Sequence, residues 1–309
     1  MCFQVIPFLG PKGLCFQGPQ GPYVDFTEIT NPLLRIVKAF AQAHSAEVDL
    51  LHVVSPVLYL PYPESFGMAT IDMSLLAELQ ERQKEKAKEK LEGLVEFFKP
   101  LKVGLYVEVG DPAEVILEKE GSYDLIFVGS HKKGLVQRIL IGSTTEKVVK
   151  YSHKPVFILK GREPEKISNV LICYDFSEYA NKALNFALSL LKPFSPHVFL
   201  VHVEETIELP LVEGVKDVLS QRYREEKEKH MKELEGRIRK EGFEAESYIL
   251  EDRSPADGIR RFLKEKPHMD LVVLGSRGLS GLKRVLLGST SSELMRSLEM
   301  PMLIHRSIE

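Results

Sequence analysis

The stretch GSRGLSGLKRVLLGST, residues 275–290, decides how this 309-residue chain is built, because a second version of it occurs earlier in the sequence. Residues 129–144 read GSHKKGLVQRILIGST, which keeps the first and last glycines and the Ser-Thr pair that follows. The two versions differ at one position of special interest, where Lys132 replaces Gly278. A repeated segment of this kind predicts a duplicated structural unit.

We call these two glycine-rich segments, 129–144 and 275–290, the glycine phrase. Other matching blocks surround it in the same order in both halves. They are DFTE (25–28) and DFSE (175–178), LLHVV (50–54) and LVHVE (200–204), and PVFIL (155–159) and PMLI (301–304). We therefore expect two domains, 1–160 and 168–309. The polar segment between them, 161–167, contains glycine and proline and is typical of a linker.

Each half alternates between two hydrophobic patterns. Runs such as LLHVV and DLVVL are apolar without alternation, which is typical of parallel strands covered on both faces. Apolar residues at helical spacing follow the first block of each half and recur in the Lys/Glu-rich stretches. They are Leu33, Ile36, Val37, Phe40 and Ala41; Ala183, Phe186, Ala187, Leu190 and Leu191; Leu91, Leu94, Val95 and Phe98; and Met231, Leu234 and Ile238. The pattern predicts an α/β fold with two tandem doubly wound domains, each with a five-stranded parallel sheet.

Bulk composition excludes several classes of function. The net charge is −3, so neither a nucleic acid nor an anionic membrane is expected as the main partner. No segment approaches the length of apolar sequence that spans a bilayer. The three cysteines form no CxxC pair, which favours a reducing, cytoplasmic setting. The histidines show no zinc-binding spacing, and no G-x-S-x-G motif of a serine hydrolase is present.

The fold class predicts where a ligand binds. In doubly wound sheets, ligands lie beyond the carboxyl ends of the strands, where the strand order reverses. If the order in each half is 3-2-1-4-5, Asp175 and Gly275 end neighbouring strands and face one crevice. His202 and Val203 would line its far side, although a structural role is the commoner one for a strand-end histidine.

The glycine phrase has the chemistry of a phosphate loop. Glycines let backbone N–H groups approach an anion closely, and Gly288-Ser289-Thr290 opens a predicted helix whose N-terminus favours negative charge. Helix capping is an equally good explanation for Ser289 and Thr290 taken singly. For Asp175, a helix N-cap is likewise compatible with a ligand role. The phrase is neither a Walker A loop nor GxGxxG, so no phosphoryl-transfer machinery can be assigned.

These motifs closely resemble the universal stress protein family in its tandem two-domain form. The resemblance implies adenine nucleotide alpha-hydrolase-like domains that bind ATP or AMP, with or without Mg²⁺, and that pair through their last strands as an internal pseudo-dimer. A homodimer of whole chains and an unknown protein partner stay open. By the family pattern, Asp175 and the backbone of Val203 would hold adenine and ribose. The phosphates would be held by Gly275, Gly278, Gly288, Ser289 and Thr290.

The first half departs from that pattern at two places. Lys132 stands where the family has a glycine, and it either blocks the phosphate or binds it through its ammonium. Residues 18–23, GPQGPY, cannot supply a central strand, so Cys2–Phe8 is expected as the displaced first strand, with an insertion at 9–22. We expect an altered or empty N-terminal site. The residues that do match are Asp25, Val53, Gly129, Gly142, Ser143 and Thr144.

Three functions remain open at this stage. The first is a regulatory stress-response protein that binds ATP or AMP mainly in its C-terminal domain. The second is a slow ATPase that uses the same pocket, for which the sequence offers no general base and no catalytic residue. The third is a partner-binding scaffold without nucleotide.

Overall fold

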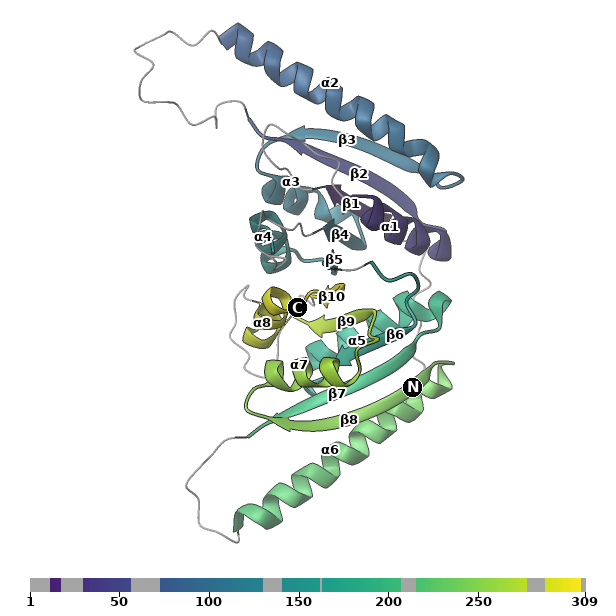
Figure 1. The fold of residues 1–309 in the computed structure, drawn as a ribbon, viewed down its shortest axis with the longest axis vertical. Coiled ribbons are helices and arrows are strands. Elements are labelled where there is room, and N and C mark those ends of the chain that lie inside the picture. The colour runs from purple at the N-terminus through teal and green to yellow at the C-terminus, as the bar shows by residue number, and fades with distance from the viewer. Residues whose placement is uncertain are drawn as a thin grey trace, which may run out of the picture. The chain divides into compact units, whose positions relative to one another are not determined.

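The computed structural model describes residues 12–17, 30–56, 73–129, 141–161, 163–206, 215–276 and 287–306. The chain divides into two compact units, the first ending at Leu159 and the second beginning at Lys160. Each unit is an α/β layer structure in its own right (Figure 1). Among the described residues, no helix is long and apolar enough to cross a membrane.

The first unit alternates strands and helices along the chain. Its elements are β1 (Lys12–Gln17), α1 (Thr30–His44), β2 (Glu47–Val54), α2 (Met73–Phe98), β3 (Val103–Val109), α3 (Pro112–Lys119), the short 3-10 helix η2 (Glu120–Ser122), β4 (Leu125–Gly129), α4 (Ser143–Tyr151) and β5 (Val156–Leu159).

The second unit repeats this succession. Its elements are β6 (Asn169–Cys173), α5 (Glu178–Leu191), the short 3-10 helix η3 (Lys192–Phe194), β7 (His197–Glu205), α6 (Val215–Lys240), β8 (Glu244–Asp252), α7 (Pro255–Glu265), β9 (Leu271–Gly275), α8 (Ser289–Ser297) and β10 (Met302–His305).

Both sheets have the strand order that was expected from the repeat. Within the first unit the order is β3-β2-β1-β4-β5, and within the second it is β8-β7-β6-β9-β10. The described strand pairs inside each unit are parallel. The first and fourth strands of each unit are therefore neighbours, and the order reverses between them. This confirms the 3-2-1-4-5 arrangement and two tandem five-stranded domains.

The position of the first strand was predicted wrongly. The strand that pairs with both β2 and β4 is Lys12–Gln17, inside the segment that was assigned to an insertion, and not Cys2–Phe8. Its apolar part is only Leu14 to Phe16, with glycine and lysine before it. A central strand with so short an apolar run has little pattern to distinguish it from the glycine- and proline-containing residues around it.

The predicted helix stripes form the cores of the two units. In α1 the residues Leu33, Ile36, Val37, Phe40 and Ala41 are all buried, and Phe40 packs its ring near Phe127 and Phe157. In α6, Met231, Leu234 and Ile238 are buried. Burying each such side chain stabilises the fold by about 1.5–3 kcal/mol. The charged stretches are therefore helices whose C-terminal halves have one buried face.

The chain enters the second unit through a buried lysine. Lys160 has no exposed surface, and its Nζ donates to the carbonyls of Met295 (3.1 Å) and Arg296 (3.0 Å) near the end of α8. Burial lowers the pKa of this ammonium, while the charge of Glu299 opposes that effect. Gly161 follows with φ +77, and a Cβ there would collide with the Glu299 carbonyl. The start of the predicted linker is thus fastened to the second unit.

Candidate functional site

The candidate site of the second unit lies at the carboxyl ends of β6 and β9. These strands pair directly, with Ile172 opposite Val273. Gly275 ends β9, and Asp175 follows two residues after the end of β6. The expectation that Asp175 and Gly275 come from neighbouring strands is confirmed.

Asp175 shapes the turn that leads from β6 into α5. Its Oδ1 accepts hydrogen bonds from the N–H (3.1 Å) and the hydroxyl (2.5 Å) of Ser177. Ser177, and not Asp175, is the N-cap of α5, since its Oγ accepts the N–H of Ala180 at 3.0 Å. Phe176 between them has φ +61, which is rare for a residue other than glycine. Two linked hydrogen bonds therefore hold this turn in one conformation.

His202 lies under that turn, near the end of β7. Its Nδ1 is 2.8 Å from the carbonyl of Tyr174, and the Phe176 ring lies edge-on to the imidazole at 4.6 Å. The carbonyl can only accept, so Nδ1 carries the proton and Nε2 is the unprotonated nitrogen. Burial lowers the pKa of His202, although the hydrogen bond to Tyr174 opposes this. These contacts agree with the structural role that is common for such histidines.

Val203 occupies the predicted place at the end of β7 and is 9% exposed. Gly258 of α7 packs against it so closely that a Cβ at Gly258 would come within 2.6 Å of the Val203 Cγ1. The helix can approach the strand end only because residue 258 has no side chain.

Helix α8 begins without a side-chain cap. Gly288 holds the N-cap position with φ −58, and its N–H donates to the carbonyl of Ser276 at 2.8 Å. Ser289 and Thr290 are the first two helical residues, so the capping explanation for them is wrong. The first N–H groups of a helix need partners outside it. Within the described parts of the chain, no bond accounts for the N–H groups of Ser289 and Thr290.

A hydroxyl that sequence analysis missed ties this helix to the sheet. The buried Ser291 Oγ donates to the carbonyl of Gly275 at 2.7 Å, joining the first turn of α8 to the end of β9. The first unit has the same connection, from the Thr145 Oγ1 to the Gly129 carbonyl at 3.3 Å. The signal that could have revealed it is the third hydroxyl residue of each GSTS or GSTT sequence.

We expect Ser291→Ala to lower the free energy of unfolding by about 1–2 kcal/mol, because it leaves the Gly275 carbonyl without this donor. Urea titration would measure the loss. Thr145→Val is the matched variant and should cost less, since its hydrogen bond is longer. Equal stability of Ser291→Ala and the parent protein would contradict this role.

A profile of the universal stress protein family matches residues 23–160 and again 166–306. The chain belongs to this family. Universal stress protein MJ0577 of Methanocaldococcus jannaschii is 36% identical over 147 residues, which are 44% of this chain and 90% of that protein. A universal stress protein of Mycolicibacterium smegmatis is 25% identical across 92% of this chain and 95% of its own length.

Solved structures show the same fold. The crystal structure of a universal stress protein from Archaeoglobus fulgidus DSM 4304 superposes with a TM-score of 0.70 at 23% identity, covering 97% of this chain and 99% of that one. The tandem arrangement of two universal stress protein domains is therefore established for the chain.

The first universal stress protein domain carries its own version of the site. Gly129 ends β4, Gly142 is the N-cap of α4, and Ser143 and Thr144 open that helix. Val53 lies near the end of β2 and is 1% exposed. The remaining predicted residues, Asp25, Lys132 and Gly278, lie outside the described residues.

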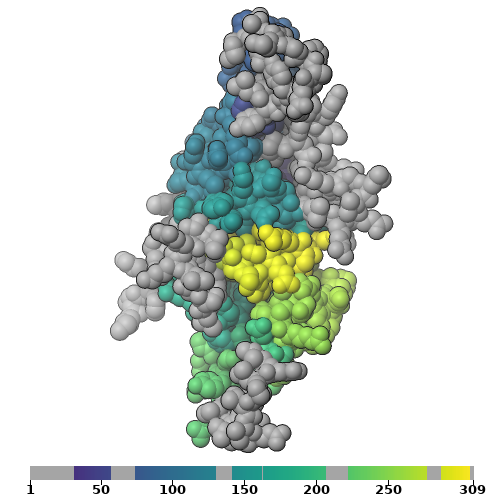
Figure 2. Space-filling model, turned by 90° about the vertical axis from the view of Figure 1, so that its left-hand side faces the viewer, coloured from purple at the N-terminus to yellow at the C-terminus, as the bar shows by residue number. Residues whose placement is uncertain are grey.

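A charged contact joins α7 to α8 beside the second site. Arg260 donates to Asp257 (2.6 Å) on its own helix and to Glu293 (2.7 Å) on α8. In the first domain, Lys147 of α4 pairs with Asp111 at 3.2 Å, with the charges exchanged between the helices. A shallow cavity of about 520 Å³ lies on this surface and includes Ser289. Figure 2 shows α7 in yellow-green next to α8 in yellow on this face.

No group of three or more His, Cys, Asp or Glu side chains in the described segments is arranged to hold a metal ion. The polar groups at the candidate site are backbone amides and hydroxyls at the start of a helix, which suit an anion.

Proposed function

We propose that the second domain binds an adenine nucleotide, ATP or AMP, and that the protein acts as a cytoplasmic stress-response regulator through this binding. The resemblance of its motifs to the family pattern supports the choice of nucleotide. The geometry of α8 and β9 supports a phosphate at the glycine phrase. The expected pairing of the two domains through their last strands stays a prediction.

The observation that carries this proposal is a glycine N-cap in both domains whose backbone conformation does not require glycine. Gly142 has φ −70 and Gly288 has φ −58, values that any residue adopts. A Cβ on Gly142 would meet nothing within 4 Å, and one on Gly275 would make only ordinary contacts at 3.5 Å. Backbone strain explains neither N-cap glycine, and crowding among the described residues explains neither Gly142 nor Gly275. A phosphate lying against the backbone would explain them.

The residues present fit such a group. The N–H groups of Ser289 and Thr290 and their hydroxyls can donate to phosphate oxygens, and the positive end of α8 favours the charge. On the other side of the crevice, Asp175 Oδ1 holds the turn, and Oδ2 has no hydrogen bond to a residue of the described ranges. This carboxylate could accept from a ribose hydroxyl, with Val203 beside it.

Binding rather than turnover is the function these contacts favour. One oxygen of Asp175 accepts a hydrogen bond from Ser177, and the Nδ1–H of His202 donates to the backbone carbonyl of Tyr174. Both groups therefore perform structural tasks. A bound nucleotide would supply negative charge and a planar base, and the chain's own role would be to hold them.

Denaturing the purified full-length protein should release close to one equivalent of ATP or AMP per chain, identified by mass. One equivalent supports a site in the second domain and an altered first site. Two equivalents would show that Lys132 is tolerated. No nucleotide, even after incubation with ATP and Mg²⁺ and after repeating the incubation in EDTA, would exclude the proposal and favour the scaffold.

A further inference from the structure

Helix α6 has two halves that differ in their relation to the sheet. Its C-terminal half packs on β8 through Met231, Leu234 and Ile238, which are at most 7% exposed. Residues 222–230, more than two turns before them, bury no side chain. Figure 1 shows α6 diverging from β8 toward its N-terminal end. The N-terminal half therefore meets the sheet through polar and ring contacts, Lys227 with Glu204 at 2.9 Å, Arg224 with Glu251, and His230 with the rings of Tyr174 and Phe176, and not through a buried apolar stripe.

Strand β8 is the last strand of its sheet on this side, with β7 as its partner. Alternate residues of a strand turn their N–H and C=O groups to opposite edges. Asp252 points to β7, because its carbonyl accepts the N–H of Thr206 at 2.9 Å. The odd-numbered residues 245, 247, 249 and 251 therefore present their backbone groups to the outer edge.

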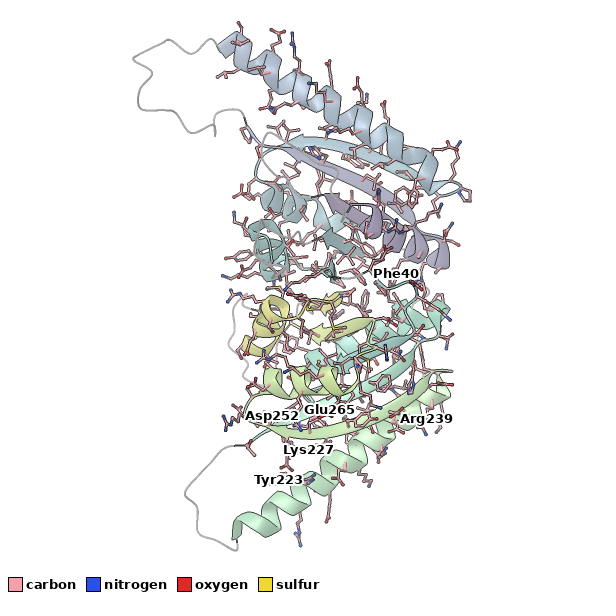
Figure 3. The ribbon with its side chains drawn as sticks, viewed as in Figure 1. Phe40, Tyr223, Lys227, Arg239, Asp252 and Glu265 are labelled. Carbon is pink, nitrogen blue, oxygen red and sulfur yellow. The ribbon has the colours of Figure 1, made fainter. Side chains whose placement is uncertain are left out.

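Side chains of α6 satisfy the first part of this edge. Arg239 donates to the Ala245 carbonyl at 2.8 Å, and the buried Glu235 carboxylate accepts the Ser247 N–H at 3.0 Å. Arg239 and Glu235 are themselves paired at 2.8 Å. Together they supply the donor and the acceptor that a neighbouring strand would supply. Figure 3 shows Arg239 at this end of α6 and Tyr223 and Lys227 toward the other.

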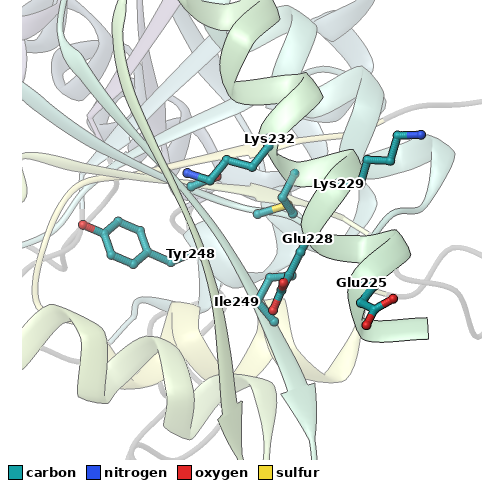
Figure 4. Close-up of a pocket in the computed structure, with 8 residues that line it drawn as sticks. Glu225, Glu228, Lys229, Lys232, Tyr248 and Ile249 are labelled. Carbon is teal, nitrogen blue, oxygen red and sulfur yellow. The ribbon is translucent and has the colours of Figure 1, made fainter. Parts of the chain in front are cut away.

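The edge opens where α6 stops packing. No hydrogen bond from the described residues accounts for the outward N–H and C=O of Ile249. A groove of about 500 Å³ lies at this point, between Ser247, Tyr248 and Ile249 of β8 and Glu225, Glu228, Lys229, Met231 and Lys232 of α6. In Figure 4, Ile249 lies between strand and helix beside Glu228, while the Tyr248 ring points away from α6. Further along, Arg261 donates to the Glu251 carbonyl at 2.6 Å, so the open stretch is short.

We propose that this groove binds an extended peptide segment of a partner protein, which adds itself as a strand to the outer edge of β8. Open strand edges accept extended peptides through main-chain hydrogen bonds, and pockets beside the strand select the side chains. The Ile249 backbone is the pairing site. Ile249 and Met231 form the apolar floor for one inward side chain, and the mixed charges of Glu228, Lys229 and Lys232 form the rim. This site is separate from the nucleotide crevice.

The first domain provides a comparison. Its edge strand β3 pairs with β2, and matching the LEG sequences at 91–93 and 234–236 puts Glu96 at the position of Arg239. Glu96 forms an ion pair with Lys99 at 2.7 Å and cannot donate to a strand carbonyl. The first domain therefore has a carboxylate at the position from which Arg239 donates to the outer edge of β8.

A phage-displayed library of random dodecapeptides, selected on the full-length protein, tests the proposal. Selected peptides, made synthetically, should bind with slowed amide hydrogen exchange at Ile249 and with NMR shifts confined to β8 and α6. Methylating alternate backbone nitrogens of the peptide should weaken binding about tenfold or more in one register and leave it unchanged in the other. Binding that is insensitive to methylation, or mapped elsewhere, overturns the proposal.

Ile249→Pro supplies the protein variant. It removes the outward N–H, and edge strands tolerate proline at such positions. Binding of the selected peptide should fall about tenfold or more, while circular dichroism and nucleotide content match the parent protein. Val107→Pro, at the corresponding register of β3, is the control and should bind the peptide normally. If no peptide is selected and Ile249→Pro instead abolishes a homodimer, the groove serves a second copy of the chain and the peptide proposal is wrong. The peptide-methylation result stands even if Ile249→Pro does not fold.

Discussion

Gly288→Val should weaken binding of ATP or AMP by about 100-fold or more, because the new side chain lies where the phosphate approaches the start of α8. The estimate corresponds to losing about two hydrogen bonds between backbone amides and a charged group. Titration calorimetry on the nucleotide-stripped protein would measure it.

The same substitution should leave the fold intact. The backbone angles at Gly288, φ −58 and ψ 154, lie in a region that valine adopts readily. We expect the midpoint of urea unfolding to stay close to that of the parent protein. Gly142→Val is the matched control in the first domain and should leave the C-terminal affinity unchanged. Unchanged affinity in Gly288→Val would refute the phosphate position.

The second unit should lose about 3 kcal/mol of stability as the pH falls from 6.5 to about 4, through His305 alone. This residue ends β10, and its ring centroid lies 5.0 Å from that of Phe186 with the two rings tilted by 41°. Burial, with a smaller contribution from the charge of Lys182, lowers the pKa of His305 to about 4. In the unfolded chain the same imidazole takes up a proton near pH 6.5.

The direction of this pH effect on the free energy of unfolding follows from which state, folded or unfolded, binds the proton. Above pH 6.5 the imidazole is neutral in both states, and the stabilisation is fully present. Below pH 6.5 the His305 imidazole becomes protonated in the unfolded chain but stays neutral in the folded chain. The free energy of unfolding therefore falls until about pH 4. The first domain has Leu159 at the position that corresponds to His305. The variant His305→Leu should therefore flatten this part of the pH profile of urea unfolding. His268→Asn, at an exposed position, should not change it, and an unaltered slope in His305→Leu would contradict the assignment.

Much of the fold followed from the duplication. Because the block DFTE or DFSE and the glycine phrase both occur in each half, the rules of doubly wound sheets predict the strand order and place Asp175 and Gly275 after neighbouring strands. The first strand was misplaced because Leu14 to Phe16 is too short a run to stand out by pattern.

The details of the site depended on distances that no pattern contains. Ser177 caps α5 in place of Asp175, and Ser291 bonds to Gly275, yet any hydroxyl near a helix start suggests the same capping role. No sequence pattern distinguishes Glu235 and Arg239 from the other charged residues of α6. Their contacts with the backbone of β8 arise from how the helix meets the strand edge, which only the folded chain reveals.

The buried Lys160 determines how the molecule can be taken apart. A recombinant C-terminal half that starts after Gly161 would lack the ammonium that neutralises the last carbonyls of α8, although every strand and helix of that half would be present. Anyone cloning the halves separately should leave Lys160 and Gly161 with the C-terminal one. The residue that reads as the tail of the first repeat is, in its contacts, the opening residue of the second.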